Sequence, residues 1–204
     1  MYKSSHFEEK DADKVLAFMK AHSFITLIGF DGTYPVATQV PVQIYQDEEG
    51  MHIVGHIMRK TDHHLAYAKN ENVMALFTGA HAYVSAAVYE NPAVASTWNY
   101  SSVQAKGKIR LMAEDETRRV IMQLTDSYED ANNSPASFHK MDTAYIDKHL
   151  KAIAGFKIRV EDLQHVFKLS QNHSTANRTN IAEHLAASDD ADSRKVAEQM
   201  KALE

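Results

Sequence analysis

The stretch WNYSSVQAKGKIRLM, residues 98–112, alternates between small or apolar side chains and polar side chains. One face would carry Ser101, Val103, Ala105, Gly107, Ile109 and Leu111, and the other face Gln104, Lys106, Lys108 and Arg110. Successive side chains of a β-strand point to opposite faces of the sheet. The stretch therefore predicts a long antiparallel strand with one solvated face.

Similar strand signals lie on both sides of this stretch. β-branched, aromatic or alternating runs predict further strands at residues 23–30, 35–45, 50–57, 72–79, 82–89, 155–163 and 164–170. The pair Asp31-Gly32 predicts a hairpin turn and suits the positive φ of type I′. Strands in runs do not fit a parallel βαβ sheet. At least seven strands are expected, in a small antiparallel barrel whose closure removes exposed edges.

Helical patterns occur between these strands and after them. Helices are predicted near residues 11–22, 62–70, 115–130, 142–150, 175–187 and 192–203. The last two are polar and are split by the acidic run SDDAD. The expected organisation is a barrel domain over residues 1–174 and a C-terminal helical appendage over residues 175–204.

Composition narrows the class of protein. The chain has 204 residues, of which 44% are hydrophobic, so it can bury a core, and it contains no cysteine for disulfides or thiolate sites. No apolar run approaches the roughly 20 residues of a spanning helix, and the N-terminus lacks a signal-peptide pattern. We therefore expect a cytoplasmic protein with no membrane association. The net charge of −5 argues against a broad basic DNA-binding surface.

The run GHIMRKTDHH, residues 55–64, joins a predicted strand to a predicted helix. Arg59, Lys60 and Thr61 fall at the junction, where a helix N-terminus favours anions. One interpretation is therefore a phosphate site. The other is a basic turn capped by Thr61 or Asp62.

Histidine spacing gives little support to a metal site. His52 and His56 are four residues apart on one strand, hence roughly 13 Å apart, and no H-E-x-x-H sequence occurs. We expect these histidines, with His63 and His64, to be solvated or hydrogen-bonded. No metal site is expected.

Two further stretches carry candidate binding residues. STWNY, residues 96–100, holds the only tryptophan of the chain. This side chain could fill the core as a plug or form a wall for a flat ligand, and the periodicity of the strand favours the core plug. FKLSQNHS, residues 167–174, ends a predicted strand with a polar cluster and with no Gly or Pro after it. Its donors could hold a ligand, or they could pair with acids such as Glu161 and Asp162. A nucleophile motif, a Walker loop and a dinucleotide glycine fingerprint are all missing.

Several segments together resemble one family, the PaiB-type FMN-binding negative transcriptional regulators. The matching segments are HFEE (6–9), PVATQVPV (35–42), GHIMRK (55–60), GAHAYVS (79–85), TWNY (97–100), GFKI (155–158) and FKLSQN (167–172). They follow the family's order and span nearly the whole chain. The family usually has proline after Gly79 and after Ser85, and Arg-Ala-Asn where this chain has Arg59-Lys60-Thr61.

The resemblance implies a fold, a cofactor and a partner. The fold would be a six- to eight-stranded antiparallel split barrel of the FMN-binding type, with peripheral helices and a C-terminal helical pair. The partner would be a second copy of the chain, in a homodimer with FMN at the subunit interface.

The same resemblance implies which residues would contact FMN. The flavin ring would be bordered by Thr38 and Gln39. The phosphate or ribityl chain would face His56, Arg59, Lys60 and Thr61. The pocket would be walled by Trp98 and Asn99 and completed by Lys168, Ser170 and Gln171.

Three functions follow from the resemblance and stay open. The first is a flavin-binding repressor, although the net charge and the missing helix-turn-helix weigh against direct DNA contact. The second is an FMN-dependent oxidoreductase that acts on a small substrate. The third is haem binding or haem breakdown, since some split-barrel relatives handle haem and this chain has 12 histidines. The fold alone does not decide among them.

Overall fold

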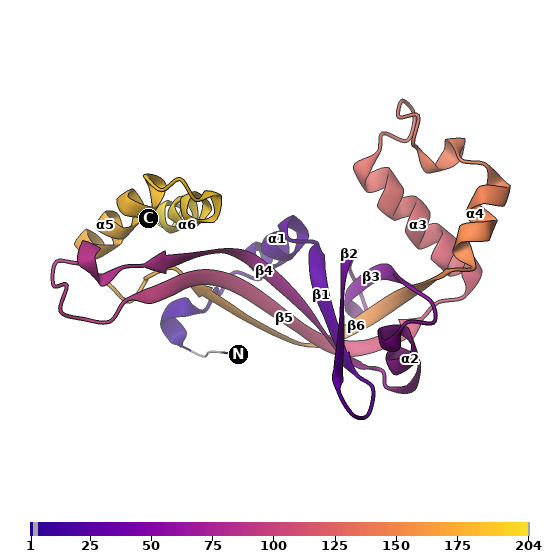
Figure 1. The fold of residues 1–204 in the computed structure, drawn as a ribbon, viewed down its shortest axis with the longest axis horizontal. Helices are drawn as coiled ribbons and strands as arrows, with labels where there is room; N and C mark the ends of the chain where they lie inside the picture. The colour runs from indigo at the N-terminus through magenta and orange to yellow at the C-terminus, as the bar shows by residue number, and fades with distance from the viewer. Residues whose placement is uncertain (2–3, 204) are drawn as a thin grey trace. The chain divides into compact units, whose positions relative to one another are not determined.

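The computed structural model describes Met1 and residues 4–203. In this part of the chain six strands close into an antiparallel barrel in the order β1-β2-β3-β6-β5-β4 (Figure 1). Their bounds are β1 Phe24–Phe30, β2 Pro35–Asp47, β3 Gly50–Met58, β4 Asn72–Val84, β5 Thr97–Leu111 and β6 Ile153–Lys168. The predicted antiparallel split barrel is confirmed.

The predicted hairpin between the first two strands is confirmed, but its turn type is wrong. β1 and β2 pair from Phe24↔Pro41 to Phe30↔Pro35, so four residues form the loop. Gly32 has a φ of +105°, whereas Asp31 is not among the described non-glycine residues with positive φ. The Asp31 carboxylate instead accepts hydrogen bonds from the backbone N–H groups of Thr33 and Tyr34, at 2.6 and 2.7 Å. An aspartate-closed loop therefore replaces the type I′ turn.

The expectation of at least seven strands is wrong, because two pairs of predicted strands are each one strand. β4 contains the run 72–79 and only the first three residues of the run 82–89, in which Ala86–Val88 form a 3₁₀ helix instead. β6 contains the run 155–163 and residues 164–168 of the run 164–170. In β4 the buried positions are Val73, Ala75 and Phe77 and then Ala80, Ala82 and Val84, so the alternation shifts by one residue between Phe77 and Ala80 while the strand continues. Small and polar residues within these runs do not interrupt the extended backbone.

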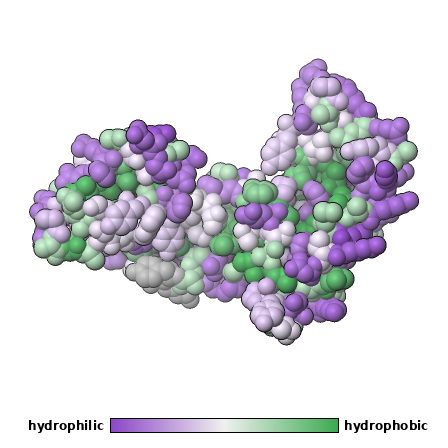
Figure 2. Space-filling model, in the orientation of Figure 1, coloured by the Kyte–Doolittle hydropathy of each residue, from purple (hydrophilic) through white to green (hydrophobic). Residues whose placement is uncertain are grey.

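Six α-helices accompany the strands in the described residues. They are α1 Ala12–Ala21, α2 Asp62–Lys69, α3 Glu114–Tyr128, α4 Thr143–Leu150, α5 Thr175–Ala186 and α6 Ala191–Lys201. On the face in view, hydrophilic residues colour much of the outer surface of α5 and α6 (Figure 2). No helix within the described residues is long and apolar enough to cross a membrane.

The chain divides into two compact units, each with residues from β4, β5 and β6. The first unit comprises Met1–Phe18, Thr78–Val103 and Gln164–Glu204, and the second comprises Met19–Phe77 and Gln104–Leu163. In the first unit α5 and α6 lie side by side (Figure 1). Their buried residues join one apolar cluster with Ala80, Ala82, Val84, Tyr89 and Leu169. The predicted C-terminal helical pair is confirmed, and the predicted domain boundary at residue 174 stays a prediction.

The second unit holds residues 104–111 of β5. Ala105, Gly107 and Ile109 are buried, whereas Lys106 and Arg110 are exposed. The predicted alternation along this strand is therefore confirmed. A separate small core lies under α3 and α4, where Phe138, Ile146 and Leu150 are buried.

Candidate functional site

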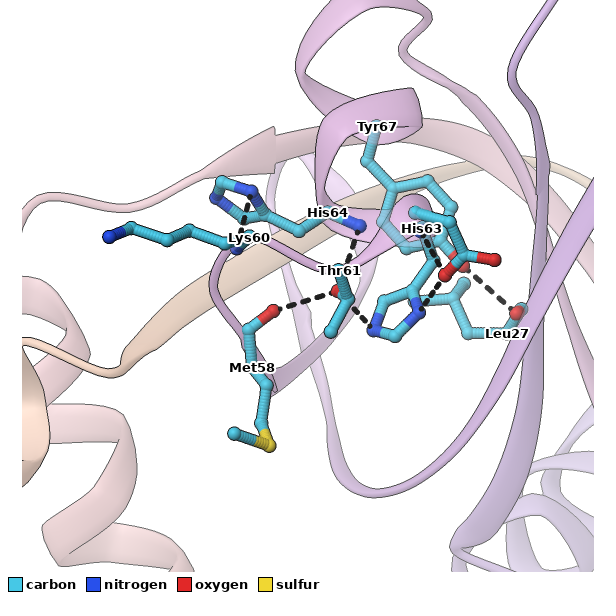
Figure 3. A network of polar contacts seen from close by, with 8 residues as sticks. Leu27, Met58, Lys60, Thr61, His63, His64 and Tyr67 are labelled. Carbon is cyan, nitrogen blue, oxygen red and sulfur yellow. Dashed lines mark hydrogen bonds and ion pairs between the residues drawn. The ribbon is translucent and has the colours of Figure 1, made fainter.

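The corner between β3 and α2, in the second unit, contains predicted phosphate residues, of which Figure 3 shows Lys60 and Thr61. β3 ends at Met58 and α2 begins at Asp62. Lys60 turns the chain with a φ of 67°, in the left-handed region, and Thr61 is the N-cap of α2. The Thr61 hydroxyl donates to the Met58 carbonyl at 3.0 Å and accepts from the His64 backbone N–H at 3.3 Å. Thr61 therefore acts as a helix cap, as one of the two interpretations expected.

Two histidines of α2 complete the polar network at this corner. His63 Nε2 lies 2.9 Å from the Thr61 hydroxyl, and His63 Nδ1 lies 3.1 Å from the Asp62 carboxylate. The Lys60 backbone N–H donates to His64 Nδ1 at 3.4 Å. Burial lowers the pKa of His64, and the charges of Arg59 and His63 lower it further. The neutral ring that results can accept the hydrogen bond from Lys60.

The positive charge of the corner is not balanced by a carboxylate ion pair. The Arg59 side chain donates through Nε to the Ile153 carbonyl at 2.6 Å, which fixes the guanidinium to β6. The Lys60 side chain is exposed. Among residues 1 and 4–203, neither side chain forms an ion pair with Asp or Glu. The N-terminus of α2 adds a positive partial charge, so the corner is suited to bind an anion.

The residues predicted beside the flavin ring lie on β2 and β3 of the same unit. Thr38 is half-buried and pairs with Leu27 of β1, and exposed Gln39 pairs with Thr26. His56 is half-buried, and within the described chain its Nδ1 has no hydrogen-bond partner. Burial lowers the pKa of His56, so its ring is neutral near pH 7. A buried ring nitrogen without a partner is unusual and can accept or donate a hydrogen bond to a ligand.

The other predicted residues lie in the first unit. There Asn99 is fully buried and Ser170 is 2% exposed. The Asn99 amide donates to the Ser170 hydroxyl at 2.9 Å, and the two side chains pair only within the protein interior. Lys168 donates through Nζ to the Trp98 carbonyl at 2.6 Å and to the Thr97 hydroxyl. These residues form the end of β6 and the start of β5.

The end of β6 explains why this strand finishes in polar residues. Ser170 has a φ of 63°, so it takes the left-handed position that glycine often fills. Gln171 accepts from the Leu169 backbone N–H at 2.8 Å and donates to the Phe167 carbonyl at 2.6 Å. The carboxamide closes the turn that ends the strand, and both of its ends are already used.

Two sequence-based interpretations of this region are wrong. Trp98 is 52% exposed and contacts the rings of His81 and Tyr83, so it is not a core plug. Trp98 and these two rings instead form an exposed aromatic group. The alternative that the polar cluster pairs with nearby acids also fails, since Glu161 pairs with Arg159 and Asp162 pairs with Lys106.

The first unit also contains a cavity of about 570 Å³ next to this strand end. Its lining includes Asn99, Lys168 and Ser170, which are among the predicted binding residues, and also Tyr89 and His173. Tyr89 and His173 were not predicted from the sequence as binding residues. His173 directly follows the polar cluster and could have been noticed, whereas nothing in the sequence connects Tyr89 with it.

His52 has partners that its spacing from other histidines did not reveal. Its Nε2 lies 3.1 Å from the Asp47 carboxylate and 3.9 Å from that of Glu49. The three ligand atoms lie within 4.8 Å of one another. The adjacent cavity is lined by the basic residues Lys108, Arg110, Lys157 and Arg159. This surrounding positive charge disfavours a bound cation, and the contact of His52 with the Asp47 carboxylate is a hydrogen bond of 3.1 Å.

A family profile and a relative of known sequence both match most of the chain. Residues 1–162 match the profile of a family described as "Putative FMN-binding domain". The chain is 30% identical over 201 residues to the Protease synthase and sporulation protein PAI 2 of Bacillus subtilis (strain 168), covering 98% of this chain and 97% of that protein.

Solved structures with a similar fold include two proteins whose names mention haem or a flavocytochrome. The FAD and heme binding protein from Mycobacterium smegmatis has a TM-score of 0.60 at 16% identity, over 78% of this chain and 72% of that one. The flavocytochrome Anf3 from Azotobacter vinelandii has a TM-score of 0.61 at 14% identity, over 78% and 68%. At these identities the likeness concerns the fold alone.

Proposed function

The chain belongs to the PaiB-type family of FMN-binding domains, and from this membership we propose that it binds FMN with the phosphate end at the corner between β3 and α2. The observation that carries the proposal is the unbalanced charge of Arg59 and Lys60 beside the N-terminus of α2. The flavin phosphate would supply the anion that these groups lack. This placement follows the sequence-based prediction for His56, Arg59 and Lys60, while Thr61 would support the corner as the helix cap.

The side chains around this corner fit an FMN molecule. Lys60 would bind the phosphate with its exposed ammonium, and Arg59, which is held by the Ile153 carbonyl, would offer its remaining N–H groups. His56 has a buried Nδ1 that needs a partner, which a ribityl hydroxyl could provide. We place the ring next to Thr38 and Gln39 on β2.

The predicted contacts from the first unit form a separate part of the proposal. Trp98 offers an exposed ring, and Lys168 offers a charged donor. Asn99, Ser170 and Gln171 already bond within the protein, so their proposed role is to shape the pocket wall. If Lys168→Ala leaves the affinity for FMN unchanged, Lys168 has no role in cofactor binding.

Two functions of the bound flavin are proposed, and separate assays distinguish them. FMN would supply electron transfer, and the chain would bind and orient it. NAD(P)H oxidation by the loaded protein would favour an oxidoreductase, and a specific operator shift would favour a repressor. The net charge of −5 makes direct DNA binding the weaker of the two.

The assembly and the location are also proposals. We propose a homodimer, because FMN lies at the subunit interface in the split-barrel proteins that the sequence resembles. We also propose a cytoplasmic location, as expected from the composition of the sequence. Light scattering during size-exclusion chromatography, with and without FMN, tests the dimer. A monomer under both conditions would contradict it.

The decisive experiment is a titration of the pure protein with FMN and with riboflavin, followed by absorbance and flavin fluorescence, with haem in parallel. Saturable binding of one FMN per chain is expected. Lys60→Gln should weaken FMN binding about tenfold, because one charge-assisted hydrogen bond is lost, and should leave riboflavin binding unchanged.

Lys69→Gln is the matched control, since Lys69 is an exposed lysine at the other end of α2. It should leave FMN affinity unchanged. Failure of FMN to bind, with a Soret shift in the haem titration, would replace the flavin assignment with haem. Equal losses for FMN and riboflavin in Lys60→Gln would remove the phosphate from the β3–α2 corner.

A further inference from the structure

The cavity of the first unit has the size and lining of a small-molecule site. Its volume of about 570 Å³ lies within the range of about 300–1,000 Å³ that such sites occupy. Its walls come from the N-terminal segment, the region before β5 and the end of β6, and they include Phe7, Tyr89, Lys168 and His173. Three of these four side chains carry aromatic rings.

Lys168 places a positive charge in this cavity with only neutral partners. Its ammonium donates to the Trp98 carbonyl at 2.6 Å and to the Thr97 hydroxyl, which leaves one N–H unused. In the part of the chain that the structure describes, it forms no ion pair with a carboxylate. Burial lowers the pKa of Lys168, as expected of a charge that is partly removed from water. A bound anion would compensate this charge.

Tyr89 gives a second, independent indication of a ligand. The residue is 7% exposed, and its buried hydroxyl lacks a hydrogen-bond partner within residues 1 and 4–203. Most buried side-chain polar atoms have a partner, so an unpaired hydroxyl on a residue that lines the cavity is a second polar group that a ligand would satisfy.

Aromatic surfaces adjoin both polar groups. The ring of His173 lies 4.8 Å from that of Tyr89, and the Phe7 ring centroid lies 6.0 Å from Lys168 Nζ. A flat, apolar ligand body could pack against these rings.

We propose that this cavity binds a small aromatic oxyanion, with its carboxylate or phosphate on Lys168 and its body against the rings of Phe7, Tyr89 and His173. The Tyr89 hydroxyl hydrogen-bonds to the same ligand. The proposal does not depend on FMN binding at the corner between β3 and α2. A free small acid and the phosphate end of a flavin share this chemistry, and the experiment distinguishes the two sources.

The test is calorimetric titration of the full chain with phenyl phosphate, with neutral phenol for comparison. One phenyl phosphate per chain is expected to bind, with phenol binding at least tenfold more weakly. Lys168→Gln should weaken phenyl phosphate at least tenfold, and Tyr89→Phe, which removes only the unpaired hydroxyl, should weaken it about threefold to tenfold.

Two control variants make the same chemical changes outside the cavity. Lys195→Gln removes an exposed lysine of α6, and Tyr83→Phe removes the hydroxyl of an exposed tyrosine on β4. Both should bind phenyl phosphate as the unmodified chain does. Circular dichroism of all four variants establishes that each is folded, and Tyr89→Phe keeps the test valid if Lys168→Gln does not fold.

The results separate the sources and can overturn the proposal. Unchanged phenyl phosphate affinity in protein saturated with FMN identifies a separate small acid. Competition with FMN, together with weaker binding of FMN but not riboflavin in Lys168→Gln, identifies the flavin phosphate. Absence of phenyl phosphate binding, or equal binding by Lys168→Gln, Tyr89→Phe and the controls, overturns the proposal. Absence of phenyl phosphate binding would leave the test of FMN at the β3–α2 corner unchanged, so the cavity proposal can fail alone. The flavin-phosphate outcome would instead move the phosphate from that corner to Lys168.

Discussion

Replacement of Gly29 by alanine should destabilise the contact that holds α2 on β1. A Cβ atom at position 29 would lie 2.5 Å from Cε1 and 2.8 Å from Cδ1 of Tyr67, closer than real Cβ contacts. Tyr67 cannot easily move away, because it is 3% exposed and its hydroxyl donates to the Leu27 carbonyl at 3.0 Å (Figure 3). The added methyl group must therefore displace the ring, the strand or the helix.

The expected loss follows from the general cost of overpacking. Inserting a methyl group into a packed core costs about 1–3 kcal/mol, so we expect a loss of about 2 kcal/mol for Gly29→Ala. In a chain of this size each kcal/mol lowers Tm by about 2–4 °C, which gives a fall of about 4–8 °C. Because α2 begins at the proposed phosphate corner, FMN affinity should fall as well.

The assay is a double-mutant cycle measured by urea unfolding. Tyr67→Leu removes the ring atoms that the alanine would contact, so Gly29→Ala should cost less than about 0.5 kcal/mol in that background. The two substitutions would then be coupled by about 1.5 kcal/mol. Additive losses within about 0.5 kcal/mol, or a Gly29→Ala variant as stable as the unmodified chain, would refute the packing argument.

Three further outcomes are expected. The Arg110 guanidinium and then the Ala113 N–H lower the pKa of Glu116 to about 2. The ionised Glu116 carboxylate therefore contributes its full stabilisation above pH 4.5, and this stabilisation is lost as the pH falls toward 2. The urea midpoints of Glu116→Gln and the unmodified chain should therefore converge over that interval, and a constant difference would contradict this. Lys60→Gly removes the side chain from a left-handed φ and should stabilise the fold by about 0.5 kcal/mol, while it weakens FMN binding about tenfold. A loss of both stability and FMN affinity, or a gain in both, would contradict this prediction. Asn99→Ala leaves the Ser170 hydroxyl unpaired in the interior and should cost about 2 kcal/mol in thermal unfolding, whereas an unchanged Tm would show that the pair contributes little.

The local elements of the fold could be predicted well. The alternation along 98–112 determines which residues of β5 are buried, because side-chain direction in a strand depends only on position. The β3–α2 corner was also found from sequence, since Thr61 before a helical run is a local cap signal. Strand continuity was not found, because whether a small or polar residue interrupts a strand depends on the strands that pair with it.

The candidate binding residues were found unevenly. Arg59 and Lys60 could be recognised as a basic pair, but only the structure shows that neither is balanced by a carboxylate in the described chain. Gln171 has a polar side chain that could contact a ligand, but its carboxamide hydrogen-bonds to the backbone of Leu169 and Phe167 and closes a turn. Tyr89 carries no signal in the sequence, because only the fold makes it part of the cavity wall.

The sequence by itself determined the periodicity of the strands, the cap of α2, the low net charge and the resemblance to the PaiB-type family. Each of these depends on residue identity and on neighbours a few positions away. Tertiary structure alone decided which polar groups have hydrogen-bond partners and which residues share a site: Lys168 and Tyr89 line one cavity although they are 79 positions apart in the chain. Hydrogen bonding and burial are properties of atoms brought together by the fold, so no local pattern reports them.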